Sequence, residues 1–430
     1  MRFFSQQHGD TGFLKKGFVL IVGSCCIGGG FLRVLPAANE AFYMSVPLIW
    51  LLVHVLLRRG WLQRLLTLPN IFQGLGAFAG VAAFFWYLSA ALQGEMIWKE
   101  VFLAAYFLIS VGIILYYARR ILQTAALFLT ARLKGQRIKR TAAGIVYGGL
   151  WLLLVFPYVL SAFSMHRPKV GDRMTPGNAL SLPYEEVLLR TRDGVRLCAW
   201  FVPSPFSDKS VVVGHGLGAN KSNFLPLVDF WHGLGYNVLI FDFRGHGQSE
   251  GHTVTFGARE KYDVGAAVDY LASRQGLDPG KIVGYGVSFG GAALIHAAAG
   301  DRRIQAVIVD STFSDVETMA REVVSLTRFV PSFLRGALAK VGVMYVSFEL
   351  GFDIRHFSPR RVIPGLQGQP VFIIHGEKDT LIPWEESKRL LKAALDPKSF
   401  YWVKSAGHYA TLTDQDYRRH VQAFLSEHNL

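Results

Sequence analysis

The chain has little cysteine and no metal-spaced cluster of it. Only 3 of its 430 residues are cysteines, and Cys25 and Cys26 are neighbours inside an apolar run. Three cysteines cannot build a disulfide framework. The sequence contains neither a CxxC pair nor a Cys/His cluster with zinc spacing, which argues against a structural zinc site. We therefore expect no metal ion and no cofactor.

Acidic side chains are scarce in the first 173 residues. These residues carry 5 Asp and Glu against 18 Lys and Arg, whereas the remainder is nearly balanced at 26 against 27. The formal charge of +14 thus comes almost wholly from the first part of the chain. Basic residues that lie between apolar runs are typical of membrane topology, so we expect no nucleic acid as a partner.

Several apolar runs in the first 165 residues are long enough to cross a bilayer, which takes roughly 20 mainly apolar residues. The five candidate spans are residues 17–35, 41–57, 71–92, 97–117 and 142–163. Three glycines at 28–30 weaken the first, and a cleaved signal peptide is its alternative. No clear cleavage site follows it, which favours a retained helix. The sequence predicts a transmembrane region over residues 1–165 and a linker over 166–184.

The central parts of the five candidate spans contain no Asp or Glu. His54 is the one ionisable candidate near the centre of a span. Proton-coupled carriers usually keep intramembrane carboxylates, so an anchor is favoured over a transporter. Thirteen Lys and Arg fall on one side of a five-span topology and two on the other. This bias predicts a multi-pass protein of a bacterial-type cell membrane, with a cytoplasmic N-terminus and the C-terminal domain on the outer face. The opposite orientation is favoured by three basic residues just after the last span, Arg167, Lys169 and Arg173.

The pattern changes after Pro183 to short β-branched runs that alternate with amphipathic stretches. This alternation predicts an α/β domain over residues 185–430, with a mostly parallel sheet flanked by helices. Arg192-Asp193-Gly194 is a hairpin signal between the first two runs. Strands are predicted at 187–191, 195–202, 211–214, 237–242, 282–286, 306–310, 371–375 and 400–403. Helices are predicted near 224–234, 258–274, 290–299, 385–394 and 414–425.

One motif in this half carries nucleophilic chemistry. Gly286-Val287-Ser288-Phe289-Gly290 matches G-x-S-x-G between a predicted strand and an Ala-rich helix. A sharp strand-to-helix turn holds such a serine in a strained conformation, and bulky neighbours would clash there. The turn leaves the hydroxyl exposed at a helix N-terminus, which favours developing negative charge. Ser288 is the candidate nucleophile, and a buried turn serine is the alternative.

A serine hydroxyl needs a base that an acid orients, and in this arrangement both follow the serine in the chain. His408, just past the final predicted strand, is the candidate base. Asp379, just past the strand at 371–375, is the candidate acid. Both would lie at the carboxyl edge of the sheet, where open α/β sheets bind their ligands. The histidines and carboxylates that compete with them are His215, His246, His296, His375, Asp310, Asp315 and Asp353.

The loop His215-Gly216-Leu217-Gly218 follows another predicted strand. Such a loop supplies one amide of an oxyanion hole, and the residue after the nucleophile supplies the other. We therefore expect the backbone N–H groups of Leu217 and Phe289 to form this hole. His215 is expected to fix the loop rather than to take part in chemistry.

Together, five motifs of this half resemble the α/β-hydrolase superfamily. They are His215-Gly216, the stretch 242–249, the Ser288 turn, His375-Gly376-x-x-Asp379 and Gly407-His408. The resemblance is greatest to the serine-aminopeptidase-like branch, which includes monoacylglycerol lipases and membrane-attached acyl hydrolases. It covers residues 185–428 and implies an α/β-hydrolase fold, here preceded by an all-α transmembrane bundle. It also implies a structural role for 242–249 and a lid within 311–364.

These features predict a membrane-anchored serine hydrolase that cleaves an acyl ester through an acyl-enzyme. Its partners would be membrane lipids, and its substrate a lipid or another small acyl ester. A serine peptidase acting on short peptides is the alternative among enzymes, and it would need an acidic subsite for the peptide amino terminus. A non-catalytic membrane scaffold is the alternative from another class, but such a protein would often lose a triad member.

Overall fold

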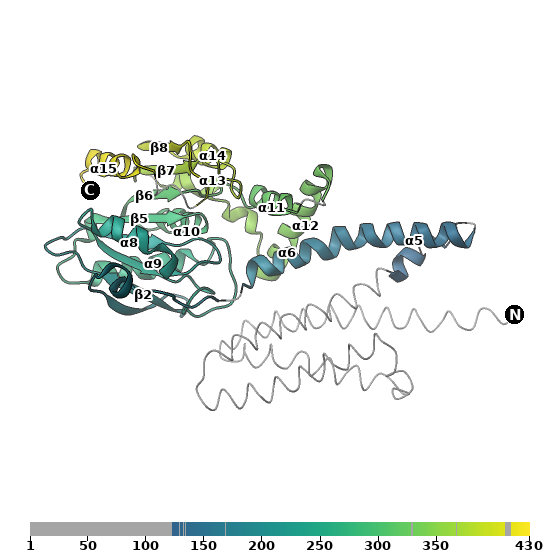
Figure 1. Ribbon diagram of the computed structural model, residues 1–430, viewed down its shortest axis with the longest axis horizontal. Coiled ribbons are helices and arrows are strands. Elements are labelled where there is room, and N and C mark those ends of the chain that lie inside the picture. Colours follow the sequence, from purple (N-terminus) through teal and green to yellow (C-terminus); the bar gives the residue numbers. More distant parts are fainter. Residues whose placement is uncertain are drawn as a thin grey trace, which may run out of the picture. The chain divides into compact units, whose positions relative to one another are not determined.

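The computed structural model describes residues 123–430 except 129, 132, 134, 168, 328–329, 367 and 409–413 (Figure 1). Four of the five predicted spans lie outside the described residues. Of the thirteen basic residues on the predicted cytoplasmic side, the structure describes Arg137, Lys139 and Arg140, and the others lie outside the described residues. The chain divides into two compact units, Met1–Trp151 and Leu152–Leu430. The second unit contains the eight-stranded sheet and the candidate site, and it is considered by itself.

A helical segment from Gln136 to Met165 covers the fifth predicted span. It consists of α5 (Gln136–Leu150), a π-helical turn (Trp151–Val155) and α6 (Phe156–Met165). Among the described residues this is the one helix whose length and composition would allow it to cross a membrane. Pro157, just after the π-helical turn, has no N–H to donate, which removes one α-helical hydrogen bond at this point.

The sheet has the strand order β1-β2-β4-β3-β5-β6-β7-β8. Its strands are β1 (Glu185–Arg190), β2 (Arg196–Val202), β3 (Ser210–Gly214), β4 (Asn237–Phe241), β5 (Ile282–Val287), β6 (Ile304–Asp310), β7 (Val371–Gly376) and β8 (Lys398–Val403). The pairs β1–β2 and β2–β4 are antiparallel, and every other pair is parallel. The predicted hairpin and the mostly parallel sheet are therefore confirmed.

Helices pack on both faces of this sheet. They include α8 (Leu225–His232), α9 (Lys261–Ser273), α10 (Phe289–Ala298), α14 (Glu385–Ala393) and α15 (Tyr417–Glu427). Along each central strand, successive side chains point to opposite faces of the sheet and are buried in two separate hydrophobic cores. Val212 and Leu239 belong to the core under α9 and α10, whereas Val213 and Val238 belong to the core under α8 and α15. Since both faces are buried, the central strands contain continuous apolar runs, as at residues 211–213 in β3 and 238–241 in β4.

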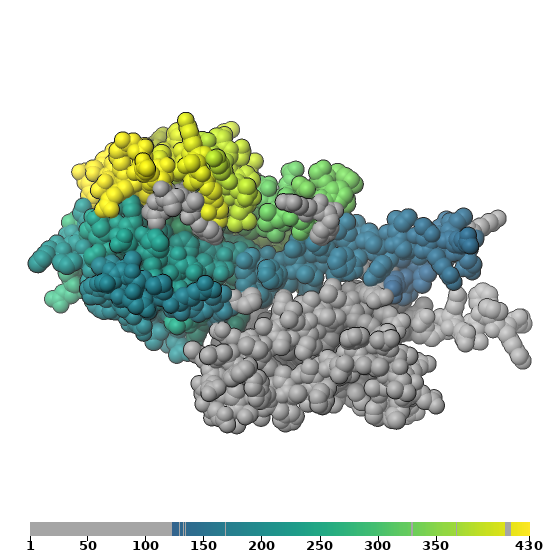
Figure 2. All heavy atoms as spheres, in the orientation of Figure 1, coloured from purple at the N-terminus to yellow at the C-terminus, as the bar shows by residue number. Residues whose placement is uncertain are grey.

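The predicted lid region between β6 and β7 contains α11 (Val316–Ser325), α12 (Ser332–Leu350) and α13 (Pro359–Val362). Helix α12 packs along α6 (Figure 2). Ser161 Oγ donates a hydrogen bond to Gly342 O at 3.0 Å. The rings of Tyr158 and Tyr345 meet edge to face with centroids 5.4 Å apart. The last turns of the apolar helix are thus packed against the segment inserted in the sheet.

Candidate active site

Ser288 lies in a strained turn between β5 and α10. Its backbone has φ 53° and ψ −116°, a conformation that costs a non-glycine residue on the order of 1–3 kcal/mol. The N–H of Ser288 donates to Asp310 O at 2.7 Å, which ties the turn to the end of β6. The residue is only 6% exposed, so it is more enclosed than the sequence suggested.

Glycines allow the backbone to approach itself closely at this turn. A Cβ on Gly286 would lie 2.6 Å from Gly290 O. A Cβ on Gly290 would lie 2.5 Å from Gly214 O and 2.6 Å from His215 O. Gly214 is the last residue of β3, so Gly290 allows α10 to begin directly beside the loop after β3. The two glycines of the motif are therefore required sterically.

Replacing Gly290 by alanine is expected to lower the free energy of unfolding by about 2–3 kcal/mol, because two backbone carbonyls would have to move. Gly300→Ala is the matched control, since a Cβ there would contact only Ala297 O, at 3.7 Å. Thermal denaturation of both variants in detergent measures the effect. Equal melting temperatures would show that the loop after β3 adapts without cost.

Asp379 and His408 are hydrogen-bonded to each other. His408 Nδ1 lies 2.6 Å from Asp379 Oδ2, and Asp379 is 7% exposed. Asp379 Oδ1 accepts the N–H groups of Leu381 and Ile382 at 2.8 and 2.9 Å. A carboxylate only accepts hydrogen bonds, so Nδ1 carries the proton and Nε2 of His408 is left as the basic nitrogen. Burial opposes the charge of Asp379, but hydrogen bonds from His375 and His408 keep the pKa of this carboxyl well below its usual range.

The fully buried His375 makes a second contact to Asp379. Its Nε2 lies 2.8 Å from Ile382 O and 3.3 Å from Asp379 Oδ2, and its Nδ1 lies 2.6 Å from Ser387 Oγ. A carbonyl oxygen can only accept, so Nε2 carries the proton and Nδ1 accepts from the serine. This histidine belongs to the His-Gly-x-x-Asp motif. The spacing of the motif alone does not tell whether His375 supports Asp379 or competes with His408 as the base.

The three predicted catalytic residues follow three parallel strands of one sheet. Ser288 follows β5, Asp379 follows β7 and His408 follows β8. Strand β6 pairs in parallel with β5 and with β7, and β7 pairs in parallel with β8. The residues therefore lie at the carboxyl edge, where ligands of open α/β sheets bind.

The competing carboxylates have other partners. Asp310 accepts a hydrogen bond from the hydroxyl of Tyr285 at 3.0 Å. Asp315 accepts from an N–H in the first turn of α11, and Asp353 does the same for the 3-10 turn Ile354–Phe357. Among the contacts of the described residues, Asp379 is the carboxylate that bonds to His408.

The loop after β3 is held from inside by His215. This ring is fully buried, and burial lowers its pKa. Its Nε2 accepts the N–H of Phe243 at 3.0 Å, so its Nδ1 carries the proton and donates to Gly216 O at 2.8 Å. Both ring nitrogens are thus used in holding backbone, which leaves no free nitrogen for acid or base chemistry.

The two amides predicted for the oxyanion hole lie on neighbouring segments. Leu217 is half-buried and precedes Gly218, whose N–H donates to His246 Nε2 at 3.1 Å. Phe289 is the first residue of α10, and its buried ring packs against Phe243 and His246 at 5.2 and 5.6 Å between centroids. Helix hydrogen bonding provides no acceptor for an N–H in the first turn, so the Phe289 amide is available to bind an oxyanion.

His246 must be neutral to hold this loop. Its Nδ1 lies 3.0 Å from Arg244 O and carries the proton, while its Nε2 accepts from Gly218. Burial and the neighbouring His215 lower the pKa of His246 to about 3. The stretch 242–249 thus has the structural role that the family resemblance implies, and part of that role is to support the loop after β3.

Acid is expected to destabilise the domain through His246. The ring takes a proton near pH 6.5 in the unfolded chain but only near pH 3 in the folded one. Between these two pH values the unfolded chain therefore binds more protons than the folded one. As the pH is lowered through this interval, the free energy of unfolding decreases by up to about 1.4 kcal/mol per pH unit. His246→Gln removes this titration, so its deficit in melting temperature should be smaller at pH 5 than at pH 7. A constant deficit would mean that the folded protein protonates this ring normally.

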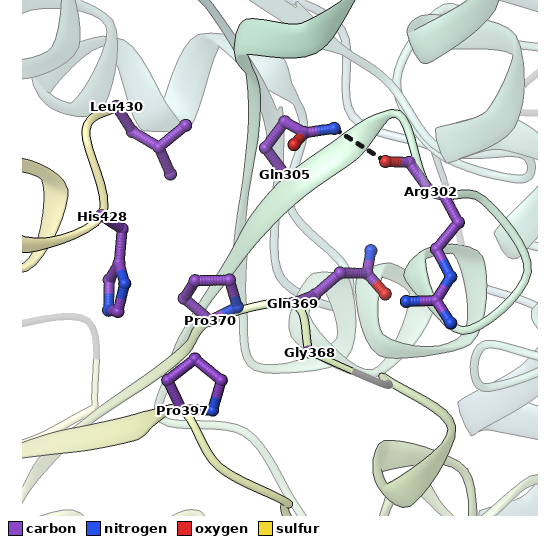
Figure 3. A pocket seen from close by; sticks show the side chains of 8 residues that line it. All are labelled: Arg302, Gln305, Gly368, Gln369, Pro370, Pro397, His428 and Leu430. Atoms are coloured by element: carbon purple, nitrogen blue, oxygen red, sulfur yellow. Dashed lines mark hydrogen bonds between the residues drawn. The ribbon is translucent and has the colours of Figure 1, made fainter.

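A surface hollow of about 390 Å³ lies at the opposite edge of the sheet (Figure 3). It is lined by residues at the amino ends of β6, β7 and β8 and by the C-terminus, namely Arg302, Gln305, Gly368, Gln369, Pro370, Pro397, His428 and Leu430. None of the predicted catalytic residues is among them, so the hollow is separate from the candidate site. In the part of the chain that the structure describes, no three His, Cys, Asp or Glu side chains are grouped to hold a metal ion.

Known proteins resemble this domain in sequence and in structure. A family model described as serine aminopeptidase, S33, matches residues 206–351. The uncharacterised Mycobacterium tuberculosis protein Rv2307c is 30% identical over 229 residues, which cover 52% of this chain and 72% of that protein. The esterase Pf2001 of Pyrococcus furiosus superposes with a TM-score of 0.51 at 25% identity, over 61% of this chain and 98% of the esterase. This chain belongs to the α/β-hydrolase superfamily.

Another relative of this α/β-hydrolase is the uncharacterised protein YfhR of Escherichia coli strain K12. It is 29% identical over 251 residues, which cover 56% of this chain and 80% of YfhR. The S33 match contains Ser288 and the loop after β3 but ends before Asp379 and His408. Assigning the acid and the base therefore depends on the geometry of this chain.

Proposed function

We propose that this α/β-hydrolase is a membrane-anchored serine hydrolase that cleaves an acyl ester with Ser288, His408 and Asp379. The observation that carries the proposal is the 2.6 Å contact between His408 Nδ1 and Asp379 Oδ2, at the sheet edge where Ser288 lies. This contact orients the imidazole and leaves Nε2 to accept a proton. A general base oriented in this way is what a serine nucleophile needs.

The proposed reaction has two steps. His408 Nε2 takes the hydroxyl proton of Ser288 as Oγ bonds to the acyl carbon, and the N–H groups of Leu217 and Phe289 bind the resulting oxyanion. Each such donor contributes roughly 3–4 kcal/mol to transition-state stabilisation. His408 then gives the proton to the leaving alcohol as the ester C–O bond breaks. In the second step His408 takes a proton from water as the water oxygen bonds to the acyl carbon. The bond between this carbon and Ser288 Oγ then breaks, His408 returns the proton to Oγ, and the acid is released.

The proposed substrate is a lipid or another acyl ester that partitions into a membrane. Helix α12 packs on α6 and exposes Phe333, Met344 and Phe348, which are 80%, 67% and 73% exposed. These side chains offer an apolar surface next to the end of the apolar helix. The proposed anchor is the multi-pass region with its N-terminus in the cytoplasm and the hydrolase domain outside, supported by the distribution of Lys and Arg in the sequence.

Two alternatives remain open to test. The family model is described as serine aminopeptidase, so a short peptide is the second candidate substrate. Hydrolysis of aminoacyl p-nitroanilides in preference to p-nitrophenyl esters would favour it. A scaffold without activity is the third candidate, and it would hydrolyse neither class of compound while remaining folded.

Labelling with a fluorophosphonate probe tests the proposed nucleophile. In isolated membranes we expect the wild-type chain to be labelled and Ser288→Ala to lose all labelling, because the probe reacts only with an activated serine. Ser273→Ala is the matched control, since its exposed hydroxyl only donates to Tyr270 O in α9. Labelling that persists in Ser288→Ala, or a folded wild-type protein that is never labelled, would reject the proposal.

A further inference from the structure

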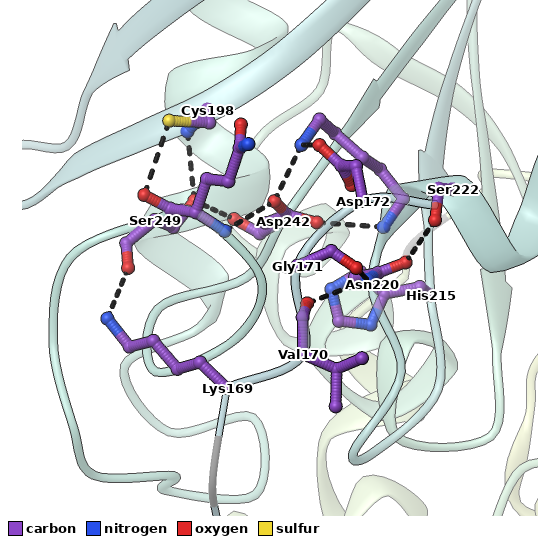
Figure 4. Close-up of polar contacts among 12 residues, drawn as sticks. Lys169, Val170, Gly171, Asp172, Cys198, His215, Asn220, Ser222, Asp242 and Ser249 are labelled. Atoms are coloured by element: carbon purple, nitrogen blue, oxygen red, sulfur yellow. Dashed lines mark hydrogen bonds and ion pairs between the residues drawn. The ribbon is translucent and has the colours of Figure 1, made fainter. Parts of the chain in front are cut away.

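The connecting segment, residues 169–173, leads from α6 into the hydrolase domain and is bound to the loop after β3 (Figure 4). Asn220 Nδ2 donates to Val170 O at 2.7 Å and to Gly171 O at 3.0 Å. Lys169 Nζ donates to Ser249 O at 2.6 Å. The Asn220 bonds attach the backbone of the connecting segment to the loop that bears the predicted oxyanion amide, and the Lys169 bond attaches that side chain to the stretch 242–249.

A buried ion cluster strengthens this attachment. The Lys221 side chain is 1% exposed, and its Nζ lies 2.5 Å from Asp172 Oδ2 and 2.8 Å from Asp242 Oδ2. The backbone N–H of Lys221 donates to Asp242 Oδ1 at 2.7 Å. Asp242 follows β4 and is fully buried. Removing one member of such a cluster leaves a buried charge without compensation, so the three side chains restrict one another.

The attachment limits the position of the Leu217 amide. The loop is held at its start by His215 and at Gly218 by His246. Its far end is held by Asn220 and Lys221, the two residues bound to the connecting segment. A displacement of about 1 Å at a catalytic group can lower a rate by roughly 100-fold. The connecting segment is therefore placed where a small shift would alter the proposed oxyanion hole.

We propose that Asn220 and Lys221 are positioning residues of the Leu217 amide and that they hold it through the connecting segment. The segment that leaves the apolar helix is then part of the active site rather than a passive tether. This inference rests on the proposed function, because it assigns the Leu217 amide to the oxyanion hole.

Two substitutions in the full-length chain test this role. Asn220→Asp keeps the Oδ1 atom that accepts from Asn223 N and loses the donor to Val170 and Gly171. Asp172→Asn removes one of the two carboxylate charges that pair with the Lys221 ammonium group. Asp208→Asn is the matched control, because it weakens a 2.6 Å ion pair with Lys281 near the amino end of β3, away from the site.

In detergent we expect kcat for p-nitrophenyl butyrate to fall about 10–100-fold in Asn220→Asp and Asp172→Asn, with KM within about twofold of wild type. Amide hydrogen exchange of residues 215–221 should become faster in both, and Asp208→Asn should match wild type in each measurement. Wild-type kcat and exchange in both test variants would overturn the inference. If the wild-type protein lacks esterase activity, the proposed function fails, whereas the exchange of 215–221 still decides whether the connecting segment holds the loop.

Discussion

His408→Gln is expected to lower kcat/KM for ester hydrolysis by about 10⁶-fold. The proposed mechanism uses Nε2 of this ring three times, to activate the serine, to protonate the leaving alcohol and to activate water. Removing the base of a triad costs about as much as removing the whole triad. The rate is measured with p-nitrophenyl butyrate on the purified full-length protein, with a melting curve to show that the variant is folded.

His420→Gln is the matched control for this experiment. The ring of His420 stacks on Tyr401 with centroids 3.9 Å apart, on helix α15, and we expect its loss to change kcat/KM less than about twofold. The double variant Ser288→Ala/His408→Gln should be no slower than either single variant, because the two residues act as a unit. Multiplied effects, or more than about 1% of the activity left in His408→Gln, would mean that another group is the base.

The strands and the nucleophile turn could be predicted because their signals are local. Strand β3 is apolar from Val211 to Val213 since both faces of the sheet are buried, and its observed start at Ser210 is one residue from the predicted one. The Ser288 turn is marked by Gly286 and Gly290, whose lack of side chains is required by backbone atoms within 3 Å of where each Cβ would be. Burial of consecutive residues thus appears in the sequence as an apolar run, and close approach of two backbone segments appears as glycines at fixed spacing.

The polar contacts that support the site could not be predicted in this way. Lys221 bonds to Asp172 and Asp242, which are 49 and 21 residues away in the chain, and no period or spacing marks such partners. Asn220 looks in the sequence like a turn residue, and its role in binding Val170 and Gly171 depends on where the connecting segment runs. The enclosure of Ser288 depends likewise on segments brought in from elsewhere. The first four spans remain predictions, because they lie outside the described residues.

Asp379→Asn is expected to lower kcat by about 10⁴-fold while the protein stays folded. The reason is the way in which this carboxylate is held. Its Oδ1 accepts the N–H groups of Leu381 and Ile382, so the amide oxygen of an asparagine must take that place and its NH₂ group must face His408. His408 Nδ1 would then accept, the ring proton would move to Nε2, and that nitrogen could no longer take the proton of Ser288.

The comparison that decides this second prediction is between a carboxylate that bonds to His408 and one that does not. Asp353→Asn removes a carboxylate that bonds to the N–H of Arg355, and we expect kcat within about twofold of wild type. Asp379→Asn should keep KM near the wild-type value, because the carboxylate bonds to Nδ1 of His408, whereas the proposed mechanism uses Nε2. A loss of kcat below about tenfold in folded Asp379→Asn would show that the ring is oriented without this carboxylate. His408 would then be held by other contacts, and Asp379 would have the structural role of bonding Leu381, Ile382 and His375.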